Sequence, residues 1–248
     1  MMKAIFLMLL MVPGMSVTHT DDDEIVIFMI GDSTMENKTY QGSNPRKGWG
    51  QVFPLYFKPA VQVKNYALGG RSTKSFRDEG HWQTVKSQLQ KGNYVIIQFG
   101  HNDSKSEANR YAEADTDFRQ NLIRYVLEAR EREAIPILCT PIVRRLFDGK
   151  GNLVDTHGAY PQVTREVAAQ LGVPLLELHV RTAETLRQMG AERSRQLFLH
   201  FEPGDYEGWK GDKEDNTHLS GTGAFKVCDL AVAELKREVP QLVPYFNP

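Results

Sequence analysis

EIVIFMIGDS, residues 24–33, joins a short apolar run to a glycine and two polar residues. The length of the run and its β-branched content predict a buried strand that ends at Gly31. In a parallel α/β sheet, ligands bind outside the carboxyl ends of the strands. The stretch therefore predicts the first strand of such a sheet, and it places Asp32 and Ser33 at the edge where a ligand would bind.

Further apolar runs predict four more strands, and helical periodicity fills the intervals. The expected strands are 61–66, 94–99, 135–140 and 174–178, and the expected helices are 49–57, 84–91, 112–133, 159–171, 180–189 and 222–238. Strands that alternate with helices predict right-handed crossovers and a parallel sheet covered on both faces. Residues 143–154, centred on the turn sequence DGKGN, predict a hairpin above the sheet. Without a repeat or a linker, residues 21–248 are expected to form a single α/β domain.

The composition is that of a globular protein, since 41% of the 248 residues are hydrophobic and 25% are charged. Thirty basic and 31 acidic residues give a formal net charge of −1. Such a chain has no basic excess to neutralise phosphates, which argues against nucleic acid as the main partner. Cys139 and Cys228 are too few for a disulfide framework, and whether they pair is open. We expect a monomer.

The first residues have the pattern of a secretory signal peptide. Lys3 precedes an apolar run at 4–12, and Pro13-Gly14 then leads to small residues that favour cleavage near Ser16. The run is too short to span a bilayer. The alternative, an apolar N-terminal strand, is disfavoured because Pro13-Gly14 ends the run. Residues 1–16 are therefore expected to export the protein to the periplasm or the medium, without a membrane anchor.

Polar residues and glycines follow the expected strands and precede the last helix, and together they suggest acyl transfer. A serine such as Ser33 is a weak nucleophile until a base such as His218 removes its proton. Asp215, one turn before His218, can hold the other imidazole nitrogen. The backbone N–H groups of Ser33 and Gly70 and the Asn102 side-chain amide are the natural donors for an oxyanion. Each residue alone is more often a cap or a turn former, but the set is harder to explain in that way.

Four motifs carry a resemblance to a known family: Gly31-Asp32-Ser33-Thr34-Met35, Gly70-Arg71-Ser72, Gly100-His101-Asn102-Asp103 and Asp215-x-x-His218. With them the sequence resembles the SGNH (GDSL-type) hydrolases over residues 25–235, and most of all their branch of rhamnogalacturonan and related polysaccharide acetylesterases. The resemblance implies a flavodoxin-like, three-layer α/β/α fold with a parallel sheet of about five strands, and neither metal nor cofactor. It also implies a triad of Ser33, Asp215 and His218, with Gly70 and Asn102 in the oxyanion hole. The asparagine after Asp215 departs from the expected spacer, although the triad spacing is kept.

Three further residues are expected to contact an acetylated polysaccharide substrate. Arg71 can grip a uronate carboxylate, because a guanidinium matches it with two hydrogen bonds; a salt bridge on the rim is the open alternative. Thr34 lies next to Ser33, and Trp209 can stack on a sugar ring. The histidines at 19, 81, 157, 179 and 200 show no metal-ligand spacing.

Other functions fit the residues less well. No Gly-x-Ser-x-Gly elbow or phosphate-binding glycine motif is found in the sequence. A lipase or thioesterase of the same family needs a broad apolar groove, whereas the loops here are polar. An esterase on another glycan, such as acetylated xylan, stays open. A non-catalytic carbohydrate-binding protein would be expected to lose Ser33, Asp215 or His218, and all three are present.

Overall fold

The computed structural model describes residues 24–39, 44–207 and 213–248, so the predicted leader lies outside the described residues. A sheet of five parallel strands runs in the order β2-β1-β3-β4-β5. The strands are β1 (Ile25–Gly31), β2 (Val61–Asn65), β3 (Tyr94–Gln98), β4 (Ile135–Cys139) and β5 (Leu175–Leu176). Met29 pairs with Asn65 and Gly31 with Gln98, so the carboxyl ends of β1, β2 and β3 meet at one edge. The five predicted strands are confirmed.

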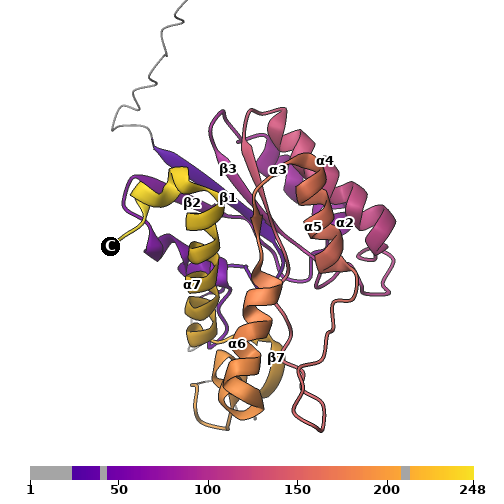
Figure 1. Ribbon diagram of the computed structural model, residues 1–248, viewed down its shortest axis with the longest axis vertical. Helices are drawn as coiled ribbons and strands as arrows, with labels where there is room; N and C mark the ends of the chain where they lie inside the picture. Colours follow the sequence, from indigo (N-terminus) through magenta and orange to yellow (C-terminus); the bar gives the residue numbers. More distant parts are fainter. Residues whose placement is uncertain (1–23, 40–43, 208–212) are drawn as a thin grey trace, which may run out of the picture.

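Helices cover both faces of this sheet (Figure 1). α1 (Trp49–Val52), α6 (Leu178–Arg193) and α7 (Gly221–Glu238) pack on one face, and α2 (Thr73–Asp78), α3 (His81–Lys86), α4 (Arg119–Arg130) and α5 (Tyr160–Leu171) pack on the other. Successive strand residues point to opposite faces. Ile27 and Met29 therefore join one buried cluster, while Phe28 and Ile30 join the other. The predicted three-layer α/β/α fold is confirmed.

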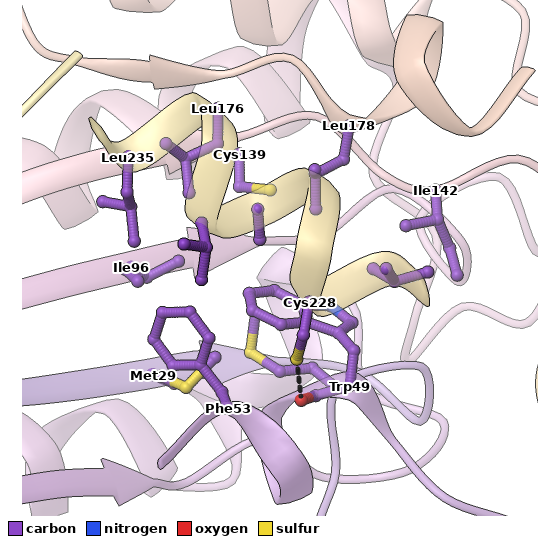
Figure 2. Packing of buried hydrophobic residues seen from close by; sticks show 14 of the residues in the cluster. Met29, Trp49, Phe53, Ile96, Cys139, Ile142, Leu176, Leu178, Cys228 and Leu235 are labelled. Carbon is purple, nitrogen blue, oxygen red and sulfur yellow. Dashed lines mark hydrogen bonds between the residues drawn. The ribbon is translucent and has the colours of Figure 1, made fainter. Parts of the chain in front are cut away.

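Trp49 links the turn after β1 to the rest of the core. Its ring is fully buried, and its Nε1–H donates to Oε1 of Gln98, the last residue of β3, at 2.7 Å. Its backbone N–H donates to the Thr34 carbonyl at 2.9 Å, and its carbonyl accepts the Cys228 thiol at 2.9 Å (Figure 2). The turn after β1 is thus held from β3 and from α7. Cys228 and Cys139 are both buried and unpaired.

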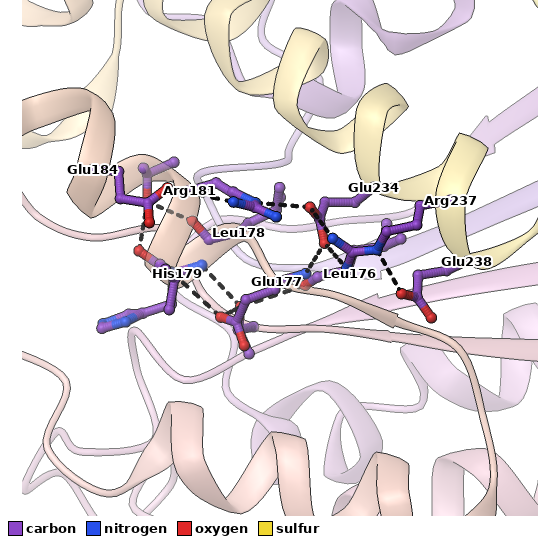
Figure 3. Close-up of polar contacts among 12 residues, drawn as sticks. Leu176, Glu177, Leu178, His179, Arg181, Glu184, Glu234, Arg237 and Glu238 are labelled. Atoms are coloured by element: carbon purple, nitrogen blue, oxygen red, sulfur yellow. Dashed lines mark hydrogen bonds and ion pairs between the residues drawn. The ribbon is translucent and has the colours of Figure 1, made fainter.

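Glu234 of α7 is a buried carboxylate that ties this helix to the start of α6. Its side chain is 4% exposed and accepts hydrogen bonds from Arg181 at 2.8 Å and from Arg237 at 2.6 Å (Figure 3). The backbone N–H of Glu177 donates to it at 3.2 Å. A buried charge is tolerated only when it is paired and hydrogen-bonded, and these three donors meet that condition.

Replacing Glu234 by alanine is expected to lower the free energy of unfolding by about 2–4 kcal/mol, because it removes a buried acceptor and leaves its hydrogen-bond donors without a partner. Glu184→Ala is the matched control: Glu184 also pairs with Arg181, at 3.5 Å, but is 49% exposed. Exposed pairs contribute little, so this variant should change stability by less than about 0.5 kcal/mol. Urea denaturation measures both, and equal effects would contradict the role assigned to Glu234.

Local chemistry shifts several expected helix boundaries. The expected helix 49–57 becomes α1 and a 3-10 turn, η1 (Phe53–Tyr56), because Pro54 lacks the N–H of a continuing α-helix. The expected helix 112–133 starts as a π-turn, η2 (Ala114–Phe118), and then continues as α4. The expected helix 84–91 is α3, which starts and ends earlier. α2 is not among the expected helices, although Ser72 and Ser75 form a capping box at its start.

A small antiparallel sheet of β6 (Phe198–Phe201) and β7 (Lys213–Leu219) is also missing from the sequence prediction. β7 reads KEDNTHL, which has no apolar alternation to mark a strand. The expected hairpin at 143–154 is confirmed, since Phe147 and Leu153 form an antiparallel bridge. Two further 3-10 turns lie in the C-terminal part of the chain: η3 (Ser194–Leu197) precedes β6, and η4 (Pro240–Tyr245) follows α7. Within the described ranges, every helix is too short or too polar to cross a membrane.

Candidate active site

Ser33 lies in a tight turn at the carboxyl end of β1, and Asp32 shapes that turn. Asp32 Oδ1 accepts the Thr34 backbone N–H at 2.9 Å and the Thr34 hydroxyl at 2.8 Å. Gly31 permits the close approach of β3, because a Cβ there would meet the Gln98 carbonyl oxygen at 2.7 Å. The Ser33 hydroxyl is thereby presented beyond the sheet edge, and its Oγ lies 3.0 Å from Nε2 of His218.

His218 and Asp215 come from an irregular part of β7. Phe198 pairs with Leu219, but the next residue of β6, Leu199, pairs with Asp215. The residues between Asp215 and Leu219 therefore leave the ladder as a bulge, and this lets two side chains of one strand meet. His218 Nδ1 lies 2.7 Å from Asp215 Oδ2.

The same bulge directs two backbone donors at Asp215. Its Oδ1 accepts the backbone N–H groups of Thr217 at 2.9 Å and of His218 at 3.0 Å. Burial raises the pKa of Asp215, but the hydrogen bonds from the His218 ring and from both backbone N–H groups outweigh it and hold the pKa well below its ordinary value. Asp215 is therefore ionised at neutral pH and orients the His218 ring.

Gly70 and Asn102 lie with Ser33 and His218 around one open pocket of about 510 Å³, which we call the Ser33 pocket. Gly70 has a φ of 77°, a conformation that favours glycine. Asn102 donates one amide N–H to the Arg71 carbonyl at 2.9 Å, which leaves its second N–H available. Among the residues that the structure describes, no acceptor meets the backbone N–H of Ser33 or Gly70. The five residues expected to form the triad and the oxyanion hole are thus brought together.

Asp103 stabilises the loop that carries Asn102, a role that the sequence did not predict. Its carboxylate is fully buried and accepts the Thr73 backbone N–H at 2.8 Å, the Thr73 hydroxyl at 2.5 Å and the Gly100 N–H at 3.1 Å. Burial raises the pKa of Asp103 to about 7, although the hydrogen bonds from Thr73 oppose the rise. The Gly-His-Asn-Asp motif could have indicated this role. It places an acidic residue directly after Asn102, and such a residue, when buried, needs hydrogen-bond donors from the surrounding loop.

The residues expected to contact substrate fare differently. Thr34 is fully buried and its hydroxyl donates to Asp32, so the expectation that its side chain contacts substrate is wrong. Arg71 donates to Glu79 at 2.9 Å and to the Gly69 carbonyl at 2.8 Å, and it does not line the Ser33 pocket. The alternative of a salt bridge on the rim is therefore the one observed. Trp209 lies outside the described residues.

Other cations line the Ser33 pocket instead: Lys38, Arg46, Lys105, Arg110 and Arg144, together with one acid, Glu36. Arg46 is the least satisfied of them. Its Nε is buried and has no hydrogen-bond partner in the described part of the chain. Burial, together with the neighbouring Arg46 charge, lowers the pKa of Lys38 to about 8. No sequence motif marks Arg46, which stands in a polar stretch before α1.

Comparisons with known proteins agree with this geometry. The model of the GDSL-like lipase/acylhydrolase family matches residues 29–224. Rhamnogalacturonan acetylesterase RhgT of Bacillus subtilis is 39% identical over 210 residues, which cover 85% of this chain and 88% of that protein. A probable rhamnogalacturonan acetylesterase of the same organism, YesY, is 31% identical over 211 residues, which cover 85% of this chain and 92% of that protein.

Solved structures share the fold. The crystal structure of YxiM from Bacillus subtilis matches with a TM-score of 0.75 and 27% identity over 90% of this chain, which spans only 58% of that protein. Axe2, an acetylxylan esterase from Geobacillus stearothermophilus, matches with a TM-score of 0.62 and 17% identity, over 85% of this chain and 94% of that one. A family match over most of the sequence, a shared fold and the residues assembled at the sheet edge lead to one assignment: the chain belongs to the GDSL-like lipase/acylhydrolase family, the SGNH hydrolases, and is a carboxylic ester hydrolase.

Proposed function

We propose that this protein is an exported serine acetylesterase that removes acetyl groups from a pectic polysaccharide of the plant cell wall, rhamnogalacturonan. The observation that carries the chemistry is the hydrogen-bonded row Ser33–His218–Asp215 in an open pocket. The names of the two similar Bacillus acetylesterases and the cations of the Ser33 pocket support the substrate class. Export rests on the leader pattern at residues 1–16.

The mechanism follows from the positions of three side chains. His218 Nε2, 3.0 Å from Ser33 Oγ, removes the hydroxyl proton as Oγ attacks the acetyl carbonyl carbon. Asp215 keeps Nδ1 protonated and stabilises the imidazolium that forms. The sugar oxygen leaves with the proton from His218, and an acetyl-serine remains. Water, deprotonated by the same imidazole, then attacks this ester and releases acetate with Ser33 restored.

The tetrahedral intermediate of each step carries a negative oxygen. The Ser33 and Gly70 N–H groups and the second amide N–H of Asn102 are the donors for it. Because these groups are already fixed by the turn after β1 and by the Arg71 carbonyl, little reorganisation is needed when the charge develops. A lipase or thioesterase would bind its acyl chain in an apolar groove, whereas the Ser33 pocket is lined by charged residues.

Acetate release from two polymers tests the substrate. Acetylated rhamnogalacturonan and acetylated xylan are compared at equal acetyl content, with p-nitrophenyl acetate as a small neutral ester. We expect kcat/KM on the pectic polymer to exceed that on xylan by at least about 10-fold, since a charged hydrogen bond contributes about 1.5–3 kcal/mol. Equal kcat/KM values on the two polymers would exclude rhamnogalacturonan as the preferred substrate, while the assignment as an esterase would stand.

Arg46 is the residue expected to read the uronate carboxylate. Arg46→Gln should raise KM on acetylated rhamnogalacturonan about 10–100-fold, because a charge-assisted pair is lost, and should leave p-nitrophenyl acetate turnover within about twofold. Arg71→Gln is the matched control, since the guanidinium of Arg71 is engaged by Glu79 outside the pocket. A loss of the same size on the neutral ester would show that Arg46 supports the pocket rather than the carboxylate.

A further inference from the structure

Asp155, His157 and His179 form a cluster outside the Ser33 pocket. Asp155 and His157 lie just after the hairpin at 143–154, and His179 lies in the first turn of α6. Each residue offers one ligand atom, and these atoms all lie within 4.8 Å of one another. The pairing of a short Asp-x-His sequence with a distant histidine is produced by the fold, and no spacing along the chain indicates it.

Both imidazoles in this cluster have a nitrogen without a partner. His157 is 2% exposed, and its Nε2 is buried with no hydrogen-bond partner among the described residues. The same is true of His179 Nε2, which lies 3.9 Å from Asp155 Oδ1. The two rings meet edge to face, with centroids 5.4 Å apart. Buried polar atoms are nearly always satisfied, so two neighbouring exceptions call for a ligand.

Neighbouring residues leave these nitrogens free. The His179 ring points away from Glu234, which accepts hydrogen bonds from the Glu177 backbone N–H and from the Arg181 side chain (Figure 3). The titratable and charged groups that face the cluster are His101, whose ring centroid lies 4.6 Å from that of His157, Arg144 near His157, and the ion-paired Arg165 and Glu177 near His179. Asp155 supplies the carboxylate charge that a bound cation requires, and its exposed side chain opens the cluster to solvent.

We propose that Asp155, His157 and His179 bind a divalent transition-metal ion, with Zn²⁺ as the best match. Two imidazole nitrogens and one carboxylate oxygen are a donor set that Zn²⁺ prefers, whereas Ca²⁺ and Mg²⁺ take oxygen ligands. Small shifts of the three side chains would bring their ligand atoms to the spacing of a tetrahedral site, and water would complete it.

The consequence of such a site is structural. An ion held there would join the segment after the hairpin to α6. Arg144, at the start of the hairpin, donates to the Thr156 carbonyl at 3.1 Å and to the His101 carbonyl at 2.8 Å, and it lines the Ser33 pocket. None of the three ligand residues lines that pocket. The ion would therefore brace one wall of the pocket and take no part in acyl transfer.

Metal titration of the purified, untagged protein after chelator treatment tests the site. We expect one Zn²⁺ per chain with a Kd of about 1 μM or tighter, and a rise in Tm on binding. Co²⁺, a spectroscopic substitute, should give the visible absorption of a tetrahedral nitrogen and oxygen site. His179→Gln should weaken binding by at least about 100-fold and Asp155→Asn by about 10-fold, and both should abolish the Tm rise.

His81→Gln is the matched control, because it makes the same change at a partly exposed histidine on α3 outside the cluster. It should bind Zn²⁺ as the original protein does. Esterase activity on p-nitrophenyl acetate, retained in His179→Gln, would establish that the variant is folded. The proposal is overturned if Zn²⁺ binds more weakly than about 1 mM, or if His179→Gln and Asp155→Asn bind it unchanged. Either result would leave the three residues as a packed polar cluster.

Discussion

Replacing Ser33 by alanine is expected to lower kcat for acetate release by at least about 10⁴-fold and to leave KM within about threefold. The substitution removes one oxygen atom, Oγ, which lies 3.0 Å from His218 Nε2. Without it no acetyl-enzyme can form, while the backbone N–H of residue 33, Gly70 and Asn102 remain in place to bind the carbonyl oxygen. The residual rate should be that of water attacking a bound, polarised ester.

Initial rates on p-nitrophenyl acetate and on acetylated rhamnogalacturonan measure this loss. Ser106→Ala is the matched control, because it removes the same hydroxyl from an exposed loop residue that does not line the Ser33 pocket. Thermal unfolding should be nearly the same for both variants. A Ser33→Ala protein that kept more than about 1% of the original turnover would require another nucleophile.

The central sheet could be predicted because buried parallel strands leave a strong signal. Residues 27–31 and 94–98 are buried throughout, and such runs stand out from the amphipathic helices between them. Once the strands are placed, their carboxyl ends converge by topology, and this brings Ser33, Gly70 and Asn102 to one edge. This part of the site is a property of the strand order and so could be predicted.

The sequence did not predict how His218 reaches Ser33. The expectation was a turn before α7, but Asp215 and His218 belong to β7. The bulge of β7 against β6 brings the Asp215 carboxylate to 2.7 Å from His218 Nδ1. A strand that reads KEDNTHL is stabilised by pairing with β6, a tertiary contact that no local pattern encodes. The two residues still meet as the motif predicted, because a separation of three positions allows the contact in either backbone conformation.

Side-chain partners are the part that sequence reasoning could not supply. Arg71 was a reasonable candidate for a carboxylate contact, but Glu79, eight positions later in the sequence, binds its guanidinium. Within the described residues the Nε of Arg46 has no hydrogen-bond partner, yet nothing in its neighbours along the chain distinguishes it. Which arginine is free depends on where every nearby carboxylate lies, and that information exists only in the fold.

Replacing Asp215 by asparagine is expected to lower kcat by about 10³–10⁴-fold while leaving the fold unchanged. The side-chain oxygen of the introduced asparagine can still accept the Thr217 and His218 backbone N–H groups that Asp215 Oδ1 accepts now. The second carboxylate oxygen is replaced by an amide that donates, so it favours the imidazole tautomer whose proton is on Nε2. That tautomer points an N–H at Ser33 and cannot take the hydroxyl proton.

Kinetics and stability together separate this effect from misfolding. The low pKa of Asp215 means that its charge stabilises the folded state above about pH 4 and is lost as pH falls. Stability of Asp215→Asn should therefore depend less on pH on the acid side than that of the original protein.

Glu214→Gln, at the neighbouring exposed position of β7 that pairs with Arg195, is the matched control and should keep kcat within about twofold. A kcat loss of less than about 10-fold in Asp215→Asn would mean that a group other than Asp215 fixes the tautomer of His218. The hydrogen bond of 2.7 Å between Asp215 and His218 would then serve only to position β7.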